Sequence, residues 1–113
     1  MTTALQVSPI YQRFRQFALS REDKPALLVG RSRLSYGELL RQVDALSDGL
    51  AAAGIGSGDH VGLLLPNCPE FVLLLLAGAR SGLVIVPQSI GLSAPAVEAA
   101  FRAADVRHLI SWA

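Results

Sequence analysis

The segment from Leu34 to Pro69 constrains the fold of this chain more than any other part, because four structural signals follow one another within it. Its sequence is LSYGELLRQVDALSDGLAAAGIGSGDHVGLLLPNCP. It contains a capped amphipathic helix, a glycine-rich turn, a short apolar strand and the start of another helix. Helices that alternate with strands in this way predict an α/β protein.

The first helix of this segment has a defined start and a defined end. Ser35 and Glu38 have the spacing of a capping box, in which a serine hydroxyl and a glutamate each bind a free backbone amide. The apolar residues that follow recur at helical spacing and are Leu39, Val43, Leu46 and Leu50. Gly54 then lies where a glycine commonly ends a helix.

The strand and the second helix of the segment are both strongly apolar. The strand His60–Leu65 is apolar at nearly every position, which indicates burial on both faces, as in a parallel sheet. Asn67 and Glu70 repeat the capping pattern and begin a helix that reaches about Ser81. Because this helix is apolar on nearly every side, we expect it to be sandwiched between other elements.

Two more strands and a third helix complete the C-terminal half. Leu83–Val86 forms a strand that Pro87 stops. Ser93 caps a helix whose apolar face contains Val97, Ala100, Phe101 and Ala104. The last strand covers Val106–Trp112.

A helix and a hairpin precede the segment. Ser8 and Pro9 are typical of a helix N-cap and its first residue. The apolar residues of this helix, which runs to about Leu19, recur at i, i+4 and i+7 and are Ile10, Phe14 and Phe17. Ala26–Val29 and Arg33–Tyr36 flank a short turn and predict a β-hairpin.

The predicted order is therefore a β-hairpin followed by α-β-α-β-α-β units. Right-handed crossovers place such strands in a parallel sheet covered by helices on both faces. Residues 1–25 form an N-terminal helix and linker, and residues 26–113 form one α/β unit.

Composition narrows the classes of partner. Ten Lys and Arg residues against nine Asp and Glu give a net charge of +1, and the arginines are scattered, so we expect no nucleic-acid partner. Mean hydropathy is +0.42 and 51% of residues are hydrophobic. A chain this apolar is expected to carry surface that other polypeptide covers.

Targeting and redox signals point to the cytoplasm. Cys68 is the one cysteine, so no disulfide forms within the chain, as suits a reducing compartment. The N-terminus lacks the apolar core of a secretory signal. The apolar run Phe71–Ala79 is too short to cross a bilayer, so we expect no transmembrane segment.

The glycine cluster does not have the pattern of a nucleotide site. Gly54, Gly56 and Gly58 are spaced GxGxG and run from a helix into a strand, whereas a dinucleotide loop runs from a strand into a helix with GxGxxG. We interpret these glycines as a helix C-cap and a tight turn. The sequence contains no Walker A motif.

The other chemistry-bearing residues lack the spacing of a catalytic or metal site: Cys68, His60, His108, Asp44, Asp48 and Trp112. Cys68 lies at a predicted helix N-terminus, which favours a thiolate, but no histidine is near it in sequence. The two histidines are far apart in sequence, and the two aspartates lie on the polar face of a helix. We interpret Trp112 as a core residue. We therefore assign no catalytic, cofactor-binding or metal-binding residue.

From Leu34 to Trp112 the chain resembles the N-terminal part of the adenylate-forming enzymes, which include acyl-CoA synthetases (fatty-acid–CoA ligases), acyl-AMP ligases and the adenylation domains of peptide synthetases. The matching pieces are LSYGELL, GIGSGDHVGLLLPN, PEFVLLLLAGARSGLVIVP and AVEAAFRAADVRHLI. The stretch Gln88-Ser89-Ile90 departs from the leucine–asparagine pair that the family often has there. The resemblance implies that residues 26–113 are the N-terminal α/β subdomain of an AMP-binding domain, truncated at Ala113.

The resemblance also implies a two-step reaction. A carboxylate attacks ATP to give an acyl-adenylate and pyrophosphate, and a thiol of coenzyme A or of a carrier-protein phosphopantetheine then takes the acyl group. Members of the family use Mg²⁺, a Ser/Thr/Gly-rich phosphate loop and a lysine, and those parts lie downstream of Ala113. We therefore expect no cofactor on this chain and no catalysis by it alone.

Three hypotheses remain open at this point. The first is an N-terminal fragment of such a ligase, whose partner is the remainder of the enzyme. The second is a stand-alone α/β interaction module that self-associates or pairs through an exposed sheet edge. The third is an unrelated nucleotide-binding α/β protein, which the missing phosphate loops disfavour.

Overall fold

The computed structural model describes residues 8–111. Its elements in chain order are α1 Pro9–Ser20, β1 Pro25–Val29, β2 Ser32–Ser35, α2 Tyr36–Ala52, β3 His60–Leu64, α3 Pro69–Ser81, β4 Val84–Gln88, α4 Ala94–Ala103 and β5 His108–Ser111. The interpretation of Trp112 and the expectations for residues 1–7 lie outside the described part.

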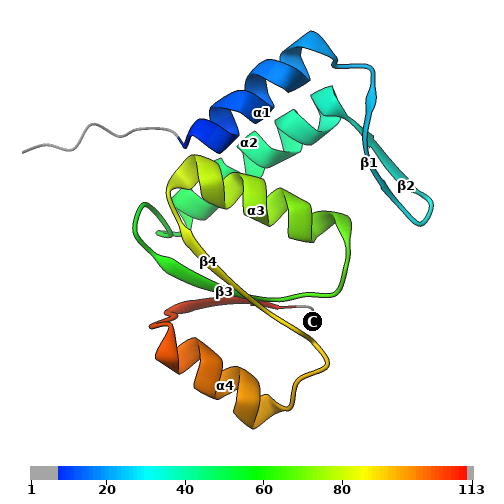
Figure 1. Cartoon of the computed structure of the whole chain (residues 1–113). Helices are drawn as coiled ribbons and strands as arrows, with labels where there is room; N and C mark the ends of the chain where they lie inside the picture. The colour runs from blue at the N-terminus through cyan, green and yellow to red at the C-terminus, as the bar shows by residue number, and fades with distance from the viewer. Residues whose placement is uncertain (1–7, 112–113) are drawn as a thin grey trace, which may run out of the picture.

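The elements are stacked in layers (Figure 1). Helices α1 and α2 form the outer layer, α3 lies beneath them, the sheet follows, and α4 covers the opposite face of the sheet. Strands β1 and β2 form a separate antiparallel hairpin that packs beside α2. The hairpin and every predicted helix and strand are therefore present.

Strands β4, β3 and β5 form a parallel sheet with β3 in the middle. The chain crosses from β3 through α3 to one neighbour, and then from β4 through α4 to the other side. Because such crossovers are right-handed, two connections that run in opposite directions place their helices on opposite faces. The arrangement confirms the predicted parallel sheet covered by helices on both faces.

The core lies mainly between α3 and the sheet. Val61 and Leu63 on β3 are fully buried, and with Leu65 and Leu74 they form one buried cluster. A second cluster joins α1, α2 and the other side of α3. Helix α3 is thus sandwiched, as predicted, although Leu75 is 40% exposed.

Helix α2 agrees closely with its prediction. The amide of Glu38 donates to Ser35 Oγ at 3.1 Å, and the amide of Ser35 donates to Glu38 Oε1 at 2.9 Å. The hydrogen bond from the Ser35 amide lowers the pKa of the Glu38 carboxyl below its ordinary value. The predicted stripe faces the core, with Leu46 half-buried and its other members buried. Gly54 has a φ of 86° beyond the helix end.

The predicted buried face of α1 is wrong for Ile10 and Phe17, whereas Phe14 is half-buried against the core as predicted. Ile10 is 68% exposed and Phe17 is 44% exposed, whereas Tyr11 and Ala18 are buried. The helix is turned toward Tyr11 because the tyrosine hydroxyl donates a hydrogen bond to Asp44 on α2. An aromatic ring whose polar end has a partner can be buried without leaving an unsatisfied group.

Two boundaries also differ from prediction. Helix α3 begins at Pro69 after Cys68, which makes no side-chain capping bond, so Asn67 is not the cap. Proline at the first helical position lacks an amide that would need one. Pro87 lies inside β4 and does not stop it, because β4 is an outer strand and can spare one amide.

The last strand begins at His108 and not at Val106. The amide of Val106 donates to the carbonyl of Phe101 at 2.9 Å and closes the end of α4. Asp105 takes the left-handed conformation that this closure needs, with φ of 55°.

Candidate functional site

Strand β5 is one of the two outer strands of the sheet, and within residues 8–111 it pairs with β3 alone. Its side chains alternate between the two faces, with Leu109 on the α4 side and Ile110 on the α3 side. Leu109 is 54% exposed. An outer strand presents unpaired amide and carbonyl groups to which another strand can add.

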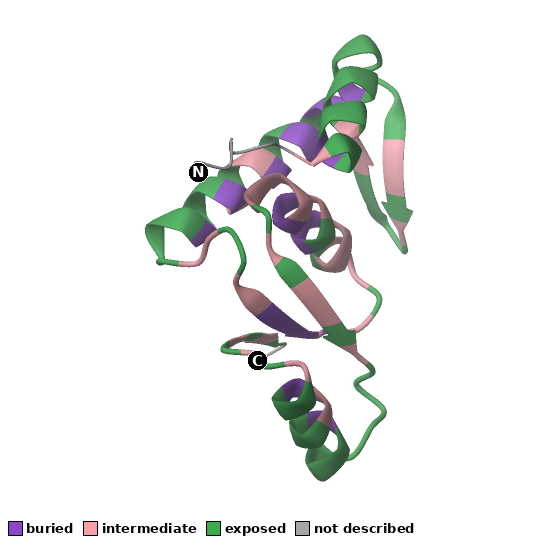
Figure 2. Cartoon of the chain, turned by 60° about the vertical axis from the view of Figure 1, so that its left-hand side comes forward, coloured by how far each residue is buried: buried purple, intermediate pink, exposed green. Residues whose placement is uncertain are grey.

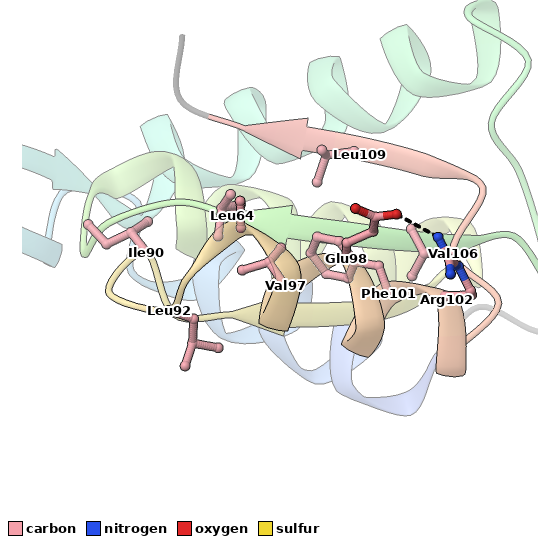
Figure 3. A pocket seen from close by; sticks show the side chains of 10 residues that line it. Leu64, Ile90, Leu92, Val97, Glu98, Phe101, Arg102, Val106 and Leu109 are labelled. Carbon is pink, nitrogen blue, oxygen red and sulfur yellow. Dashed lines mark hydrogen bonds and ion pairs between the residues drawn. The ribbon is translucent and has the colours of Figure 1, made fainter.

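An apolar hollow, here called the α4 hollow, lies between β5 and α4 and has a volume of about 560 Å³. Figure 3 shows its lining from β3, the loop before α4, α4 and β5, which includes Leu64, Ile90, Leu92, Val97, Phe101 and Leu109. An ion pair between Glu98 and Arg102 lies at its rim. Both partners are exposed, so the pair contributes little to stability.

A second apolar hollow, here called the α3 hollow, lies on the other face of β5 and measures about 520 Å³. Its lining is mostly apolar and includes Leu46, Leu65, Leu73, Leu74 and Ile110. Strand β5 therefore has an apolar hollow on each side of its free edge. A surface of this kind is typical of a contact with further polypeptide.

A third hollow, of about 450 Å³, lies at the carboxyl ends of β3 and β4. Ligands of parallel sheets commonly bind beyond these ends. The polar residues in its lining are Asn67, Gln88 and Ser89, and none of them carries a charge. This hollow therefore offers no cation for a phosphate group.

The glycine cluster is a turn, as predicted. Gly58 has a φ of 87°, and its amide donates to the carbonyl of Gly82 at 2.9 Å. The amide of Gly56 donates to Asp59 Oδ2 at 2.8 Å. These two amides donate their hydrogen bonds to groups of the protein itself and not to a ligand.

The two histidines lie at the same end of the sheet on neighbouring strands, although they are far apart in sequence. His60 Nδ1 lies 2.7 Å from the carbonyl of Ala104, and His108 Nε2 lies 3.9 Å from Asp59 Oδ2. Cys68 is half-buried at the start of α3. Across the described residues no three His, Cys, Asp or Glu side chains converge on a metal site.

A polar network that was not predicted from the sequence connects α1, α2 and α3. Arg80 on α3 lies 3.0 Å from Asp48 and 3.7 Å from Asp44 on α2, and Tyr11 on α1 donates to Asp44. The polar face of α2, on which Asp44 and Asp48 were predicted to lie, thus forms contacts with α1 and α3. The sequence signal for this network was a pair of aspartates four residues apart on one helix, together with an arginine near the end of the next helix.

Burial and the hydrogen bond to Asp44 raise the pKa of Tyr11 from 10.0 to about 12. The unfolded chain therefore loses this proton at lower pH than the folded protein does. The resulting stabilisation is complete below pH 10 and is lost as the pH rises from 10 to about 12. A shift of this size corresponds to about 2 to 3 kcal/mol.

We expect the free energy of unfolding to fall over this range in the unaltered chain, and to fall less in Tyr11→Phe. Urea unfolding followed by circular dichroism at several pH values measures the difference. Parallel pH profiles for the two proteins would contradict the assignment to Tyr11.

A family model described as AMP-binding enzyme matches residues 14–112. The chain belongs to the AMP-binding enzyme family. The sequence resemblance to the adenylate-forming enzymes is thereby confirmed, and the match extends from α1 through β5.

Several relatives within the AMP-binding family are acyl-CoA ligases by name. The chain is 33% identical to acetyl-coenzyme A synthetase 1 of Candida albicans over 94% of its own length and 17% of the synthetase. It is 41% identical to feruloyl-CoA synthase of Amycolatopsis sp over 61% of its length and 14% of that enzyme. The chain thus spans less than a fifth of the relatives that it matches.

Solved structures of the AMP-binding family share the fold. The N-terminal subdomain of Klebsiella oxytoca NpsA matches with a TM-score of 0.88 and 27% identity, over 92% of this chain and 27% of that one. The same subdomain in complex with 3-hydroxybenzoyl-AMSN matches with a TM-score of 0.89 and 26% identity, over 98% of this chain and 28% of that one. The chain therefore corresponds to part of an adenylation domain. None of its described helices is long and apolar enough to cross a membrane.

Proposed function

We propose that this chain is the scaffold part of an ATP-dependent carboxylate-activating ligase and that it catalyses no step alone. The complete enzyme would form an acyl-adenylate and pass the acyl group to a thiol of coenzyme A or a carrier protein. ATP, Mg²⁺ and the thiol would be held by the remainder of that enzyme, because the hollow at the carboxyl ends of β3 and β4 has no charged residue in its lining.

The free edge of β5 is the observation that carries this proposal. It has an apolar hollow on each side, and the half-exposed Leu109 lines the α4 hollow. We propose that the remainder of the adenylation domain adds to this edge and fills both hollows. The role of the chain is then to supply three parallel strands and their helices as a rigid wall.

Carboxylate-dependent ATP–pyrophosphate exchange by the purified chain tests the absence of catalysis. We expect no exchange above background with acetate, ferulate or a fatty acid, because the hollow at the carboxyl ends of β3 and β4 has no charged residue and the one cation at the α4 hollow, Arg102, is paired with Glu98. Thermal unfolding with and without ATP and Mg²⁺ provides a second readout, and we expect no shift. Clear exchange that depends on added carboxylate would refute the proposal.

A stand-alone interaction module is the second candidate, and the same β5 edge favours it. In that case two copies would pair edge to edge with two-fold symmetry. Sedimentation velocity distinguishes the candidates, since an interaction module gives a discrete dimer. An uncovered scaffold instead gives a broad series of associated species.

We also propose that the protein acts in the cytoplasm. The one cysteine, Cys68, is unpaired and half-buried, as suits a reducing compartment. Fractionation of cells that express the chain tests this location.

A further inference from the structure

Charge is distributed unevenly along the chain. Residues 8–41, which form α1, the hairpin and the start of α2, hold seven basic and three acidic residues, a net charge of +4. The basic residues are Arg13, Arg15, Arg21, Lys24, Arg31, Arg33 and Arg41, and the acidic ones are Glu22, Asp23 and Glu38. Residues 42–113 hold three basic and six acidic residues, a net charge of −3. Residues 8–41 are therefore basic, although Asp44 and Asp48, further along α2, lie in the same outer layer.

One flank of α1 in this layer alternates apolar and basic side chains. Ile10, Arg13, Phe17 and Arg21 follow one another at i, i+3, i+7 and i+11 and are all exposed. The guanidinium of Arg21 lies 3.6 Å from the centre of the Phe17 ring. Two residues of this flank, Ile10 and Phe17, belong to the stripe that α1 was predicted to bury and are exposed in the structure.

The flank continues toward the base of the hairpin. The Phe17 ring lies 5.2 Å from that of Tyr36, whose amide donates to the carbonyl of Lys24 at 2.9 Å. We define the basic face as Ile10, Arg13, Phe17, Arg21 and Lys24. Figure 2 shows the exposed outer side of α1 next to the hairpin.

The outer side of the hairpin repeats the same pairing of side chains. Leu28 is 67% exposed and lies directly opposite Arg33 across the two strands. Glu22 and Asp23, in the loop between α1 and the hairpin, are the nearest acidic residues in sequence and are included in the net charge.

We propose that the basic face binds an anionic lipid surface. Arginine and lysine near such a surface are attracted to lipid phosphates, and apolar side chains between them can enter the headgroup region. The exposed Ile10 and the partly exposed Phe17 lie among cations, and apolar side chains in that setting favour lipid over an acidic protein. The helix lies on the surface and does not cross it.

This binding leaves the β5 edge free. Helix α1 lies at one end of the molecule and α4 at the other, with α3 and the sheet between them (Figure 1). A lipid surface against the basic face therefore does not cover the α4 hollow. The inference is independent of the proposed function, since its test measures no catalysis.

Flotation of the chain with lipid vesicles in a density gradient tests the proposal. Protein that has self-associated without binding lipid stays at the bottom of the gradient. We expect flotation with vesicles of phosphatidylcholine and phosphatidylglycerol, and none with phosphatidylcholine alone. Added salt should weaken it. The double variant Arg13→Gln/Arg21→Gln should lower the partition coefficient by about 25-fold, since each of the two cations contributes roughly fivefold.

Three further variants make the result specific. Arg102→Gln/Arg107→Gln removes the same charge from the α4 and β5 side and should change binding less than about twofold. Arg13→Lys/Arg21→Lys keeps the charge and should keep the binding, which separates loss of charge from loss of folding. Ile10→Ser should weaken binding without changing its dependence on salt.

Three results would overturn the proposal. One is failure of the unaltered chain to float with the anionic vesicles. Another is equal loss of binding in the two glutamine double variants. The third is binding to polyglutamate without flotation, which would identify an acidic protein as the partner of the basic face.

Discussion

Replacing Leu63 by alanine should lower the free energy of unfolding by about 2 to 5 kcal/mol. Leu63 is fully buried at the centre of the sheet and packs in one cluster with Val61 and Leu74. Because β3 is held between two strands and lies under α3, its surroundings cannot easily close the cavity. Domains of this size are stable by only about 5 to 15 kcal/mol, so the loss is a large share of the total.

Urea unfolding measures this loss, and Leu75→Ala is the matched control. Leu75 has the same chemistry on α3, but 40% of its surface is exposed. Its replacement should cost less than about 1 kcal/mol, as is usual away from the core. Equal losses for the two variants would mean that the core does not lie between α3 and the sheet.

Leu109→Asp should weaken self-association of the isolated chain by at least about tenfold. Leu109 is half-exposed on the free edge of β5 and lines the α4 hollow. Any partner that covers this edge would bury the introduced carboxylate, and burying an unpaired charge costs several kcal/mol. Sedimentation velocity over a range of concentrations measures the change.

Leu28→Asp controls for general loss of apolar surface. Leu28 lies on the hairpin and is 67% exposed, more than Leu109. If association depended only on exposed apolar area, Leu28→Asp would weaken it at least as much. A chain that is already a monodisperse monomer without either change would show that the β5 edge is not a contact surface.

The elements that could be predicted from sequence are those specified by local signals. For α2, the capping serine and glutamate and the apolar stripe all lie within the helix itself. The sheet followed from the alternation of helices and strands, because crossover handedness leaves few arrangements.

The details that could not be predicted depend on residues far apart in sequence. The buried face of α1 is set by the bond between Tyr11 and Asp44. Pro87 is tolerated because β4 is an outer strand, and strand order cannot be read from the strand itself. A Cβ atom on Gly62 would lie 2.9 Å from the Phe101 ring, so α4 approaches the sheet closely at a glycine that had no distinct sequence signal.

The candidate site could be predicted only in outline. The high mean hydropathy indicated that some apolar surface is covered by other polypeptide. It did not indicate where on the molecule that surface lies. The α4 hollow is lined from four segments of the chain, among them Leu64, Ile90, Phe101 and Leu109. No spacing within any one segment brings those side chains together.

A graft tests most directly the proposal that this chain is a scaffold of an adenylating enzyme. The matching segment of the Amycolatopsis feruloyl-CoA synthase is replaced by the corresponding residues of this chain. We expect the purified graft to retain ATP–pyrophosphate exchange with that enzyme's own carboxylate. We expect Leu109→Asp in the graft to lower the rate of exchange. A folded graft without exchange, or one whose exchange rate is unchanged by Leu109→Asp, would contradict the proposed scaffold role.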